Sequence, residues 1–502
     1  MNLVEASWIP VRDHGGSGVF RLLTYEELLC SNGEWQVNLP RDDLELACIQ
    51  LLVCMTQVMF LPESGGQLRD WHAGPLAPEV FTDGAALCRE WFDLDHPTQP
   101  FMQSRGVKAA ETTPVQKLLI GLPEGNNHAF FNEVGEVKRI GAAAAAIALF
   151  NQASNCPSFG GGFKAGLRGG SPVTTLVAGR HLRETLWRNV LPRERINTFL
   201  PLWQRGDPDD VPTWVRPIQE GETIQAQSIG LVRGLFWQPA KVELVADEDG
   251  ECDLLGTKGP RYRGFRKEKF NFSIAGLWPH PHGARVYSDK KDWKFASFTT
   301  AAPAWNWLAE LVVPRRIDGA DMREGCVPAP AIAQLREIAP KEMGCLHLLV
   351  GGYRTNQASV TERRHELFSL AAGWDKSDAD NLKILVDLAK QSKGALRGRL
   401  FFASKGNKDK GMKSIGAPIY EAGEKLFYAR TEALIRDTVA NASTWDEFLA
   451  AKESFVGRLS MVCEKIFSEL TDPYAVKPEL IPIIAWARRS MNSDLLKLRE
   501  GK

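Results

Sequence analysis

The sequence lacks an excess of charge of either sign. Its 502 residues include 61 Lys and Arg and 61 Asp and Glu, so the formal net charge is zero. This balance excludes a histone-like protein that coats nucleic acid by bulk positive charge, although it leaves room for a locally basic groove. The composition, 44% apolar and 24% charged, is that of a globular protein and excludes a wholly disordered, collagen-like or coiled-coil chain.

Cysteines and long apolar runs are also scarce. The nine cysteines are odd in number and none forms a C-x-x-C pair. This pattern argues against a disulfide framework and a Cys-rich zinc site, and it favours a reducing compartment. The first residues lack the basic and apolar segments of a secretion signal. The most continuous apolar run, at 140–150, is well short of the roughly 20 residues that span a bilayer. We therefore expect a cytoplasmic protein with no membrane partner.

The sequence pattern changes near residue 370. Residues 1–370 mix short strand-like runs with helical stretches and frequent Gly and Pro, as in the hairpin expected around 8–22. Residues 371–502 instead contain four segments with apolar residues at helical spacing, near 378–402, 417–440, 444–470 and 478–499. This pattern predicts an α+β protein, in which a large mixed N-terminal domain (1–370) precedes an antiparallel four-helix bundle (371–502).

The segment 159–170 contains six glycines, with Lys164 and Arg168 between them. So many glycines are expected where the backbone passes close to a ligand, because no Cβ keeps phosphates or base edges away from the amides. The spacing fits neither the Walker motif nor the dinucleotide fingerprint. A flexible structural loop is the alternative interpretation.

Basic residues are concentrated in three stretches, at 164–195, 258–269 and 393–413, despite the neutral total. A single charged stretch is usually a solvated surface. Several in one neutral chain, one of them beside the glycine-rich segment, favour a groove for a polyanion.

Candidate catalytic groups are few. Asp93 and Asp95 could bind a hard cation, but a lone D-x-D motif is commonplace and an ordinary loop is the stronger interpretation. His280 and His282 have no third ligand nearby and are more simply explained as structural. No hydrolase, zinc-protease or kinase signature is present. We therefore expect no enzyme activity, no cofactor and no metal.

Several blocks together resemble one family closely, the large subunit (CasA) of the type I-E CRISPR Cascade surveillance complex. They occur in the family's order and span most of the first 365 residues. The blocks are 8–11 (Trp-Ile-Pro-Val), 39–43 (Leu-Pro-Arg-Asp-Asp), 100–103 (Pro-Phe-Met-Gln), 146–152 (Ala-Ile-Ala-Leu-Phe-Asn-Gln), 159–164 (Phe-Gly-Gly-Gly-Phe-Lys), 166–170 (Gly-Leu-Arg-Gly-Gly), 232–240 (Val-Arg-Gly-Leu-Phe-Trp-Gln-Pro-Ala), 276–282 (Gly-Leu-Trp-Pro-His-Pro-His) and 351–359 (Gly-Gly-Tyr-Arg-Thr-Asn-Gln-Ala-Ser).

The resemblance implies a non-catalytic subunit that inspects duplex DNA for the protospacer-adjacent motif (PAM) and starts strand separation and R-loop formation in antiviral defence. The implied DNA-binding residues form three groups: a glycine loop, a lysine finger in the minor groove and a wedge inserted between base pairs. They are Phe159, Gly160 and Gly161 in the loop, Lys269 as the finger, and Asn356, Gln357 and Ala358 in the wedge.

The resemblance also implies contacts outside the PAM site. A loop at Phe130, Phe131 and Asn132 is similar to a segment that docks beside the guide RNA's 5′ handle, and Lys164, Lys290, Lys291 and Lys294 would contact phosphates. The implied partners are double-stranded DNA, guide RNA through the complex, the backbone, small-subunit and handle-binding proteins of Cascade, and a helicase–nuclease effector.

This sequence departs from the family pattern in two places. Ser158 replaces a glycine at the first loop position, and paired cysteines that suggest a zinc site in some members are missing. Two alternatives stay open: a metal-dependent nucleic-acid-processing enzyme that uses Asp93 and Asp95, and a purely architectural subunit.

Overall fold

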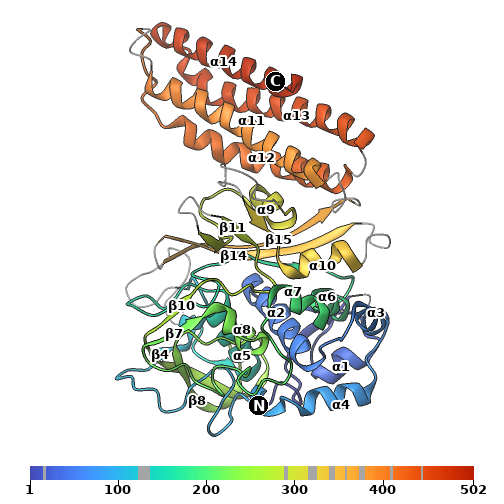
Figure 1. The fold of residues 1–502 in the computed structure, drawn as a ribbon. Coiled ribbons are helices and arrows are strands. Elements are labelled where there is room, and N and C mark those ends of the chain that lie inside the picture. The colour runs from blue at the N-terminus through green and yellow to red at the C-terminus, as the bar shows by residue number, and fades with distance from the viewer. Residues whose placement is uncertain are drawn as a thin grey trace. The chain divides into compact units, whose positions relative to one another are not determined.

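The computed structural model describes residues 1–14, 18–122, 136–287, 292–314, 325–338, 345–356, 359–371, 379–406, 411–442 and 445–501. The chain divides into two compact units (Figure 1). The first comprises Met1–Ala301, Pro314–Ile338 and His347–Leu367, and the second comprises Ala302–Val313, Ala339–Leu346 and Phe368–Lys502. The second unit thus takes in a segment near residue 308 that lies far from the bundle in the sequence.

The first unit combines short helices with several small sheets. Its helices are α1 (Tyr25–Cys30), α2 (Asp42–Met59), α3 (Gly65–Ala73), α4 (Pro78–Ala86), α5 (Ala142–Ser154), α6 (Leu182–Asn189), α7 (Arg193–Phe199), α8 (Leu231–Leu235) and α10 (Pro330–Ile338). Its strands are β1 (Ile9–Asp13), β2 (Phe20–Leu23), β3 (Trp35–Val37), β4 (Thr113–Pro114), β5 (Ile140–Gly141), β6 (Thr174–Val177), β7 (Glu222–Gln225), β8 (Lys241–Glu251), β9 (Lys258–Glu268), β10 (Phe272–Ala275), β11 (Arg285–Tyr287), β12 (Trp293–Phe295), β13 (Cys326–Val327), β14 (Leu346–Asn356) and β15 (Ser359–Leu370).

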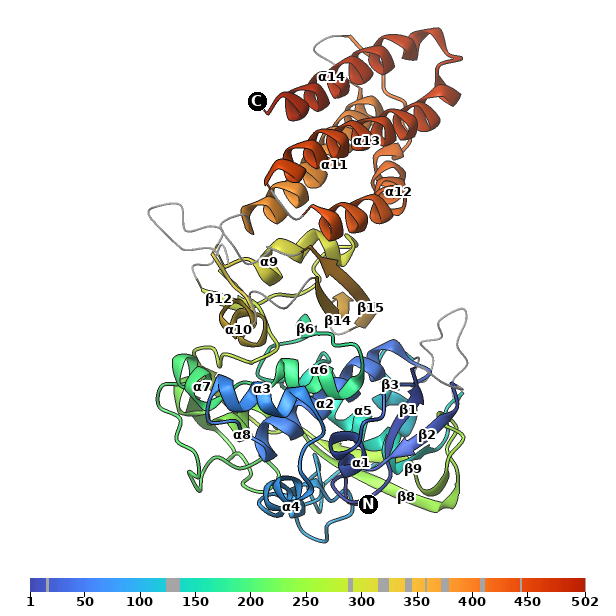
Figure 2. The same ribbon diagram turned by 90° about the vertical axis from the view of Figure 1, so that its right-hand side faces the viewer.

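Helices α2 and α5 form the centre of the first unit, where they lie side by side (Figure 2). Nearly every residue of both is buried, and five consecutive alanines at 142–146 give α5 little side-chain bulk at its N-terminal end. Short side chains allow two helix backbones to approach closely. The C-terminal end of α5 leads directly into the glycine-rich segment, so this packed core positions the start of that segment.

Two sheets support the remaining candidate residues. Strands β8 and β9 form a long antiparallel hairpin within the sheet that also contains β4 and β5. A second sheet has the order β15–β14–β6, in which Thr174 of β6 lies opposite Gly351 of β14. The hairpin expected near the N-terminus is confirmed, since β1 pairs with β2 in antiparallel register.

The second unit is dominated by four long helices, coloured orange to red in Figure 1. They are α11 (Ala379–Lys405), α12 (Ile419–Asn441), α13 (Trp445–Thr471) and α14 (Ile481–Glu500), and the short α9 (Leu308–Val312) belongs to the same unit. Helix α11 packs against each of the other three. The predicted fold class, a mixed α+β region followed by a helical bundle, is confirmed. No helix in the described part of the chain is long and apolar enough to span a membrane.

Candidate nucleic-acid interface

The glycine-rich segment begins with three glycines in left-handed backbone conformation. Gly160, Gly161 and Gly162 have φ values of 76°, 56° and 88°, which residues with a Cβ adopt at a cost. The Ser158 hydroxyl accepts a hydrogen bond from the Gly160 amide at 3.4 Å, so the residue that departs from the family pattern closes the turn. A Cβ built on Gly161 would meet nothing within 4 Å. The glycine at 161 is therefore required by backbone conformation, and the space beside it is open to a ligand.

Further along, the same segment folds back on α5. A Cβ on Gly166 would lie only 2.4 Å from the Ala153 carbonyl oxygen, so no larger residue fits at this position. The loop is thus held at one end by close backbone contact and presents Gly161 and Gly162, both exposed, at the other. These contacts argue against the alternative interpretation of this segment as a flexible loop.

Lys269 meets the glycine loop although the two are over 100 residues apart in sequence. It follows β9 directly, is exposed, and its ammonium group donates a hydrogen bond to the Gly161 carbonyl at 3.1 Å. The neighbouring carboxylate of Glu268 is engaged by Lys241 at 2.8 Å instead, and that hydrogen bond holds the pKa of Glu268 below its usual value. The structure therefore brings together two of the residues that the sequence resemblance assigned to PAM reading.

Phe159 anchors the loop to β9. Its half-buried ring packs on Phe163 and Phe265, with ring centroids 5.5 and 5.6 Å apart, and the Lys267 ammonium lies 5.1 Å from its centroid. Lys164 lines a small hollow beside Ser158, Phe159 and Gly166. Sequence reasoning assigned Phe159 to DNA and overlooked Lys267 as its partner. The available signal was the pair of aromatic residues, Phe265 and Phe270, that flank the basic residues at 266–269.

The remaining assigned residues lie on other elements or outside the described residues. Asn356 is exposed at the end of β14, and Lys294 is exposed on β12, which belongs to a third sheet with β11 and β13. The assigned residues that lie outside the described residues are Gln357, Ala358, Lys290, Lys291, Phe130, Phe131 and Asn132.

In two of the three basic stretches, several cations are buried or paired with carboxylates. In the first, Arg168 is buried, hydrogen-bonded to the Ser154 carbonyl and the Thr174 hydroxyl, and burial lowers its pKa to about 10. Arg188 of the same stretch pairs with Glu184 at 2.6 Å. Tertiary packing thus buries Arg168 and pairs Arg188 with a carboxylate, so these two side chains are not available to a polyanion, while the groove itself stays a prediction.

Three cations of the third stretch are neutralised within the bundle. Lys393 and Arg397 of α11 both pair with Glu424 of α12, at 2.8 and 2.9 Å, and Arg399 pairs with Asp494 of α14 at 2.6 Å. These ion pairs link helices, so these three side chains contribute to bundle packing. The second stretch, on and after β9, keeps its exposed cations Lys258, Arg263, Arg266 and Lys269.

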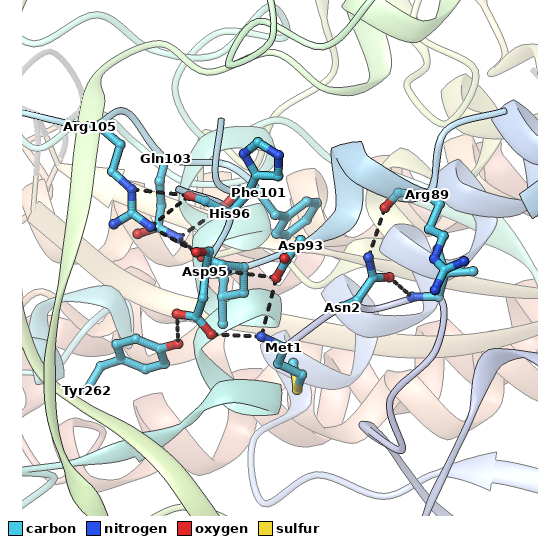
Figure 3. Close-up of polar contacts among 12 residues, drawn as sticks. Met1, Asn2, Arg89, Asp93, Asp95, His96, Phe101, Gln103, Arg105 and Tyr262 are labelled. Carbon is cyan, nitrogen blue, oxygen red and sulfur yellow. Dashed lines mark hydrogen bonds and ion pairs between the residues drawn. The ribbon is translucent and has the colours of Figure 1, made fainter. Parts of the chain in front are cut away.

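The carboxylates of Asp93 and Asp95 bind groups of the protein itself (Figure 3). The Met1 amino group lies 3.3 Å from Asp93 Oδ1 and 2.7 Å from Asp95 Oδ2, and the Tyr262 hydroxyl donates to Asp95 Oδ1 at 2.7 Å. Within the described residues, no three His, Cys, Asp or Glu side chains gather as metal ligands would. These contacts support the interpretation of the D-x-D motif as a structural loop.

His280 and His282 are fully buried and hydrogen-bonded to each other. The His282 amide donates to His280 Nδ1 at 3.0 Å, and their rings lie 5.2 Å apart. Burial, with the nearby Arg168 cation, lowers the pKa of His282 to about 3 and also lowers that of His280. Both histidines are therefore neutral parts of the core at physiological pH, in keeping with a structural role.

This burial predicts a loss of stability in mild acid. In the unfolded chain, His282 takes up a proton below its ordinary pKa of about 6.5, whereas the folded protein resists protonation down to about pH 3. Stability should thus fall as pH drops below about 6.5, by up to about 1.4 kcal/mol per pH unit for each such histidine. Urea unfolding at pH 7.5, 6 and 5 measures this slope. His282→Gln should reduce the dependence of the unfolding free energy on pH. The control His14→Gln, at an exposed position, should leave it unchanged. Equal slopes in the wild type and both variants would contradict the assignment of His282 as a buried neutral residue.

Comparison with known proteins gives consistent matches. The family model of the CRISPR-associated protein Cse1 matches residues 2–459. The CasA/Cse1 protein of Thermus thermophilus is 28% identical over 264 residues, so the chain spans about half the length of this curated relative, with 50% of each covered. A crystal structure of CasA from Thermus thermophilus matches with a TM-score of 0.74 at 18% identity over 99% of each chain. Thermobifida fusca Cse1 matches with a TM-score of 0.75 at 17% identity, over 100% of this chain and 98% of that one.

Proposed function

Because the chain belongs to the CRISPR-associated protein Cse1 family, the large subunits of the type I-E Cascade complex, we propose that it reads the PAM in duplex DNA from the minor groove. It then inserts a wedge that starts strand separation, while the guide RNA reads the target by base pairing. The chain acts by binding, not by catalysis, and strand cleavage falls to a helicase–nuclease that the complex recruits in the cytoplasm.

The contact between Lys269 and the Gly161 carbonyl carries this proposal. An ammonium group has three N–H donors, and Gly161 takes one of them, which leaves two for acceptors of the DNA. The minor groove presents adenine N3 and thymine O2 as acceptors, and a slender lysine stem suits its narrow width. Three left-handed glycines beside this lysine let the backbone itself approach the base edges. Since the minor-groove pattern is degenerate, we expect several related PAMs to be accepted.

The wedge is assigned to Asn356, Gln357 and Ala358. Asn356 ends β14 and Ser359 starts β15, so these residues join two neighbouring strands of one sheet. Such a rigid base suits a side chain that must separate stacked base pairs, which costs about a few kcal/mol per step. Lys164, Lys290, Lys291 and Lys294 are proposed to hold the incoming duplex by its phosphates, and Phe130, Phe131 and Asn132 to dock beside the guide RNA handle.

The partners follow from the same assignment. A structure titled CRISPR RNA-guided surveillance complex contains a chain with this fold, at a TM-score of 0.68 and 18% identity over 98% of this chain and 99% of that one. We accordingly propose the backbone, small-subunit and handle-binding proteins of Cascade, with their guide RNA, as partners. Double-stranded DNA and the helicase–nuclease effector complete the set.

Omitting this subunit from the guide-loaded complex tests the proposal. Guide-loaded complex is assembled with and without this subunit, and its binding to PAM-containing and PAM-scrambled duplexes is measured at one fixed salt concentration. The complete complex should prefer the PAM duplex at least about tenfold, and the complex without the chain should show no preference. An equal loss of both affinities would favour the architectural alternative. Metal-dependent cleavage by the isolated chain would favour the enzyme alternative.

A further inference from the structure

A chain of buried hydrogen bonds leads from the glycine-rich segment to β14. The Arg168 guanidinium donates to Asn155 Oδ1, and Asn155 Nδ2 donates to Asn151 Oδ1 at 3.0 Å. Asn151 Nδ2 in turn donates to the Tyr353 hydroxyl at 2.7 Å. That hydroxyl donates to Asp43 Oδ2 at 2.8 Å, and all five side chains are buried. This hydrogen-bond chain therefore connects residues that are more than 300 positions apart in the sequence.

Every donor in this chain points the same way, from a cation at Arg168 to a carboxylate at Asp43. In an interior of low dielectric, aligned hydrogen bonds polarise and strengthen one another. Burial raises the pKa of Tyr353 well above its usual value, so its hydroxyl keeps the proton that it donates. Breaking one link would leave a buried donor or acceptor without a partner, which is unfavourable. The two ends of the chain are thus expected to move together.

A second connection reaches β14 through β6. The Thr174 hydroxyl accepts a hydrogen bond from Arg168 at 3.0 Å and donates one to Asn155 Oδ1 at 3.1 Å. Thr174 is the first residue of β6 and lies opposite Gly351 of β14. Gly351 and Tyr353 are two residues apart on that strand, and β14 ends three residues later at Asn356. Both routes from the glycine-rich segment consequently meet just before the end of β14.

The far end of the chain holds both strands of the hairpin. Asp43 accepts two hydrogen bonds from Arg41, at 3.0 and 2.7 Å, which fixes its carboxylate at the start of α2. It is bonded by Tyr353 of β14 and also by Arg363 of β15, whose Nη1 lies 3.3 Å from Oδ1. One buried carboxylate on the central helix thereby sets the position of β14 and β15 together.

We propose that Tyr353 is a positioning residue that couples the glycine loop to the β14–β15 hairpin, so that DNA contact at the loop governs strand opening at the hairpin's end. This inference rests on the proposed function and extends it to residues that do not touch DNA. Coupling between two sites can be carried by a network of hydrogen bonds, and the aligned chain from Arg168 to Asp43 provides one.

The test removes a single oxygen atom. Tyr353→Phe keeps the ring and deletes the hydroxyl that joins Asn151 to Asp43. In reconstituted complex, PAM-duplex affinity should stay near the wild-type value. The rate of opening, followed by 2-aminopurine fluorescence in the base pairs next to the PAM, should fall between about twofold and 30-fold. Opening at the wild-type rate would overturn the inference.

Tyr25→Phe is the matched control. Tyr25 is equally buried, and its hydroxyl makes one hydrogen bond, 2.7 Å long, to the Thr56 hydroxyl. This variant loses a buried hydroxyl of the same kind but leaves the hydrogen-bond chain intact, so the complex that contains it should open the duplex at the wild-type rate. Equal slowing in both variants would reduce the effect to general destabilisation and would also overturn the inference.

A second substitution keeps the test decisive if Tyr353→Phe fails to assemble. Asn155→Ser interrupts the same hydrogen-bond chain nearer the glycine loop. The rate of duplex opening should again fall between about twofold and 30-fold. When both variants assemble, their double mutant should be slowed by less than the sum of the two single effects, because both substitutions interrupt the route through Asn151. Fully additive effects would show that Tyr353 and Asn155 act independently and would contradict the inference. Lys269→Ala in the same complex addresses the proposed function separately, because it should lower the PAM preference about tenfold or more whatever the outcome at Tyr353.

Discussion

Replacing Lys269 by alanine is expected to remove most of the preference of the guide-loaded complex for PAM duplexes. Lys269 is exposed, and its ammonium is held by the Gly161 carbonyl at the edge of the glycine loop. A side chain that reads base edges contributes about 1–3 kcal/mol of discrimination. The ratio of PAM-duplex to scrambled-duplex affinity should therefore fall about tenfold or more, as measured by equilibrium binding at fixed salt.

The control must separate base reading from simple loss of charge. Lys497 is an exposed lysine of the bundle, on α14, and Lys497→Ala removes the same charge. This variant should retain the PAM preference of the wild type. A Lys269→Ala complex that still distinguishes the two duplexes would refute the assignment of Lys269 and would move the architectural alternative ahead.

Replacing Gly161 by alanine should weaken PAM binding as strongly while leaving the fold intact. A methyl group at this position meets no protein atom within 4 Å, so it projects into the open space where the duplex is proposed to lie. The backbone could then no longer approach the base edges. We expect at least about a tenfold loss of PAM-duplex affinity, with normal assembly of the complex.

Backbone strain must be separated from this steric effect. At φ near +56°, alanine costs about 1–2 kcal/mol relative to glycine. Gly106 offers a matched position, since its φ is +70° and a Cβ there also meets nothing within 4 Å. Gly106→Ala should lower the thermal midpoint by a similar amount and leave PAM binding unchanged. If both variants bind the PAM duplex alike, the glycine at 161 serves only backbone conformation.

Much of the site could not be predicted from the sequence, because its residues come together only when the chain folds. The hydrogen-bond chain joins α2, α5, the glycine-rich segment and β14, and no periodicity or spacing relates residues 43, 151 and 353. Arg168 looked like a cation for DNA because its sequence neighbours are glycines and lysine. In the structure it is buried beside Asn155. The close packing of Gly166 on α5 holds this part of the segment against the helix, where Arg168 finds its buried partners.

The fold class, the four long helices and the location of the glycine loop could all be predicted from the sequence. These features are local: helical apolar spacing recurs every three to four residues, and backbone conformations with positive φ demand glycine wherever they occur. Tertiary structure alone decided which charges remain available to a ligand. Lys393 and Arg399 are neutralised by Glu424 and Asp494 on other helices. Lys269 remains exposed beside Gly161, because β9 ends where the loop turns back from α5.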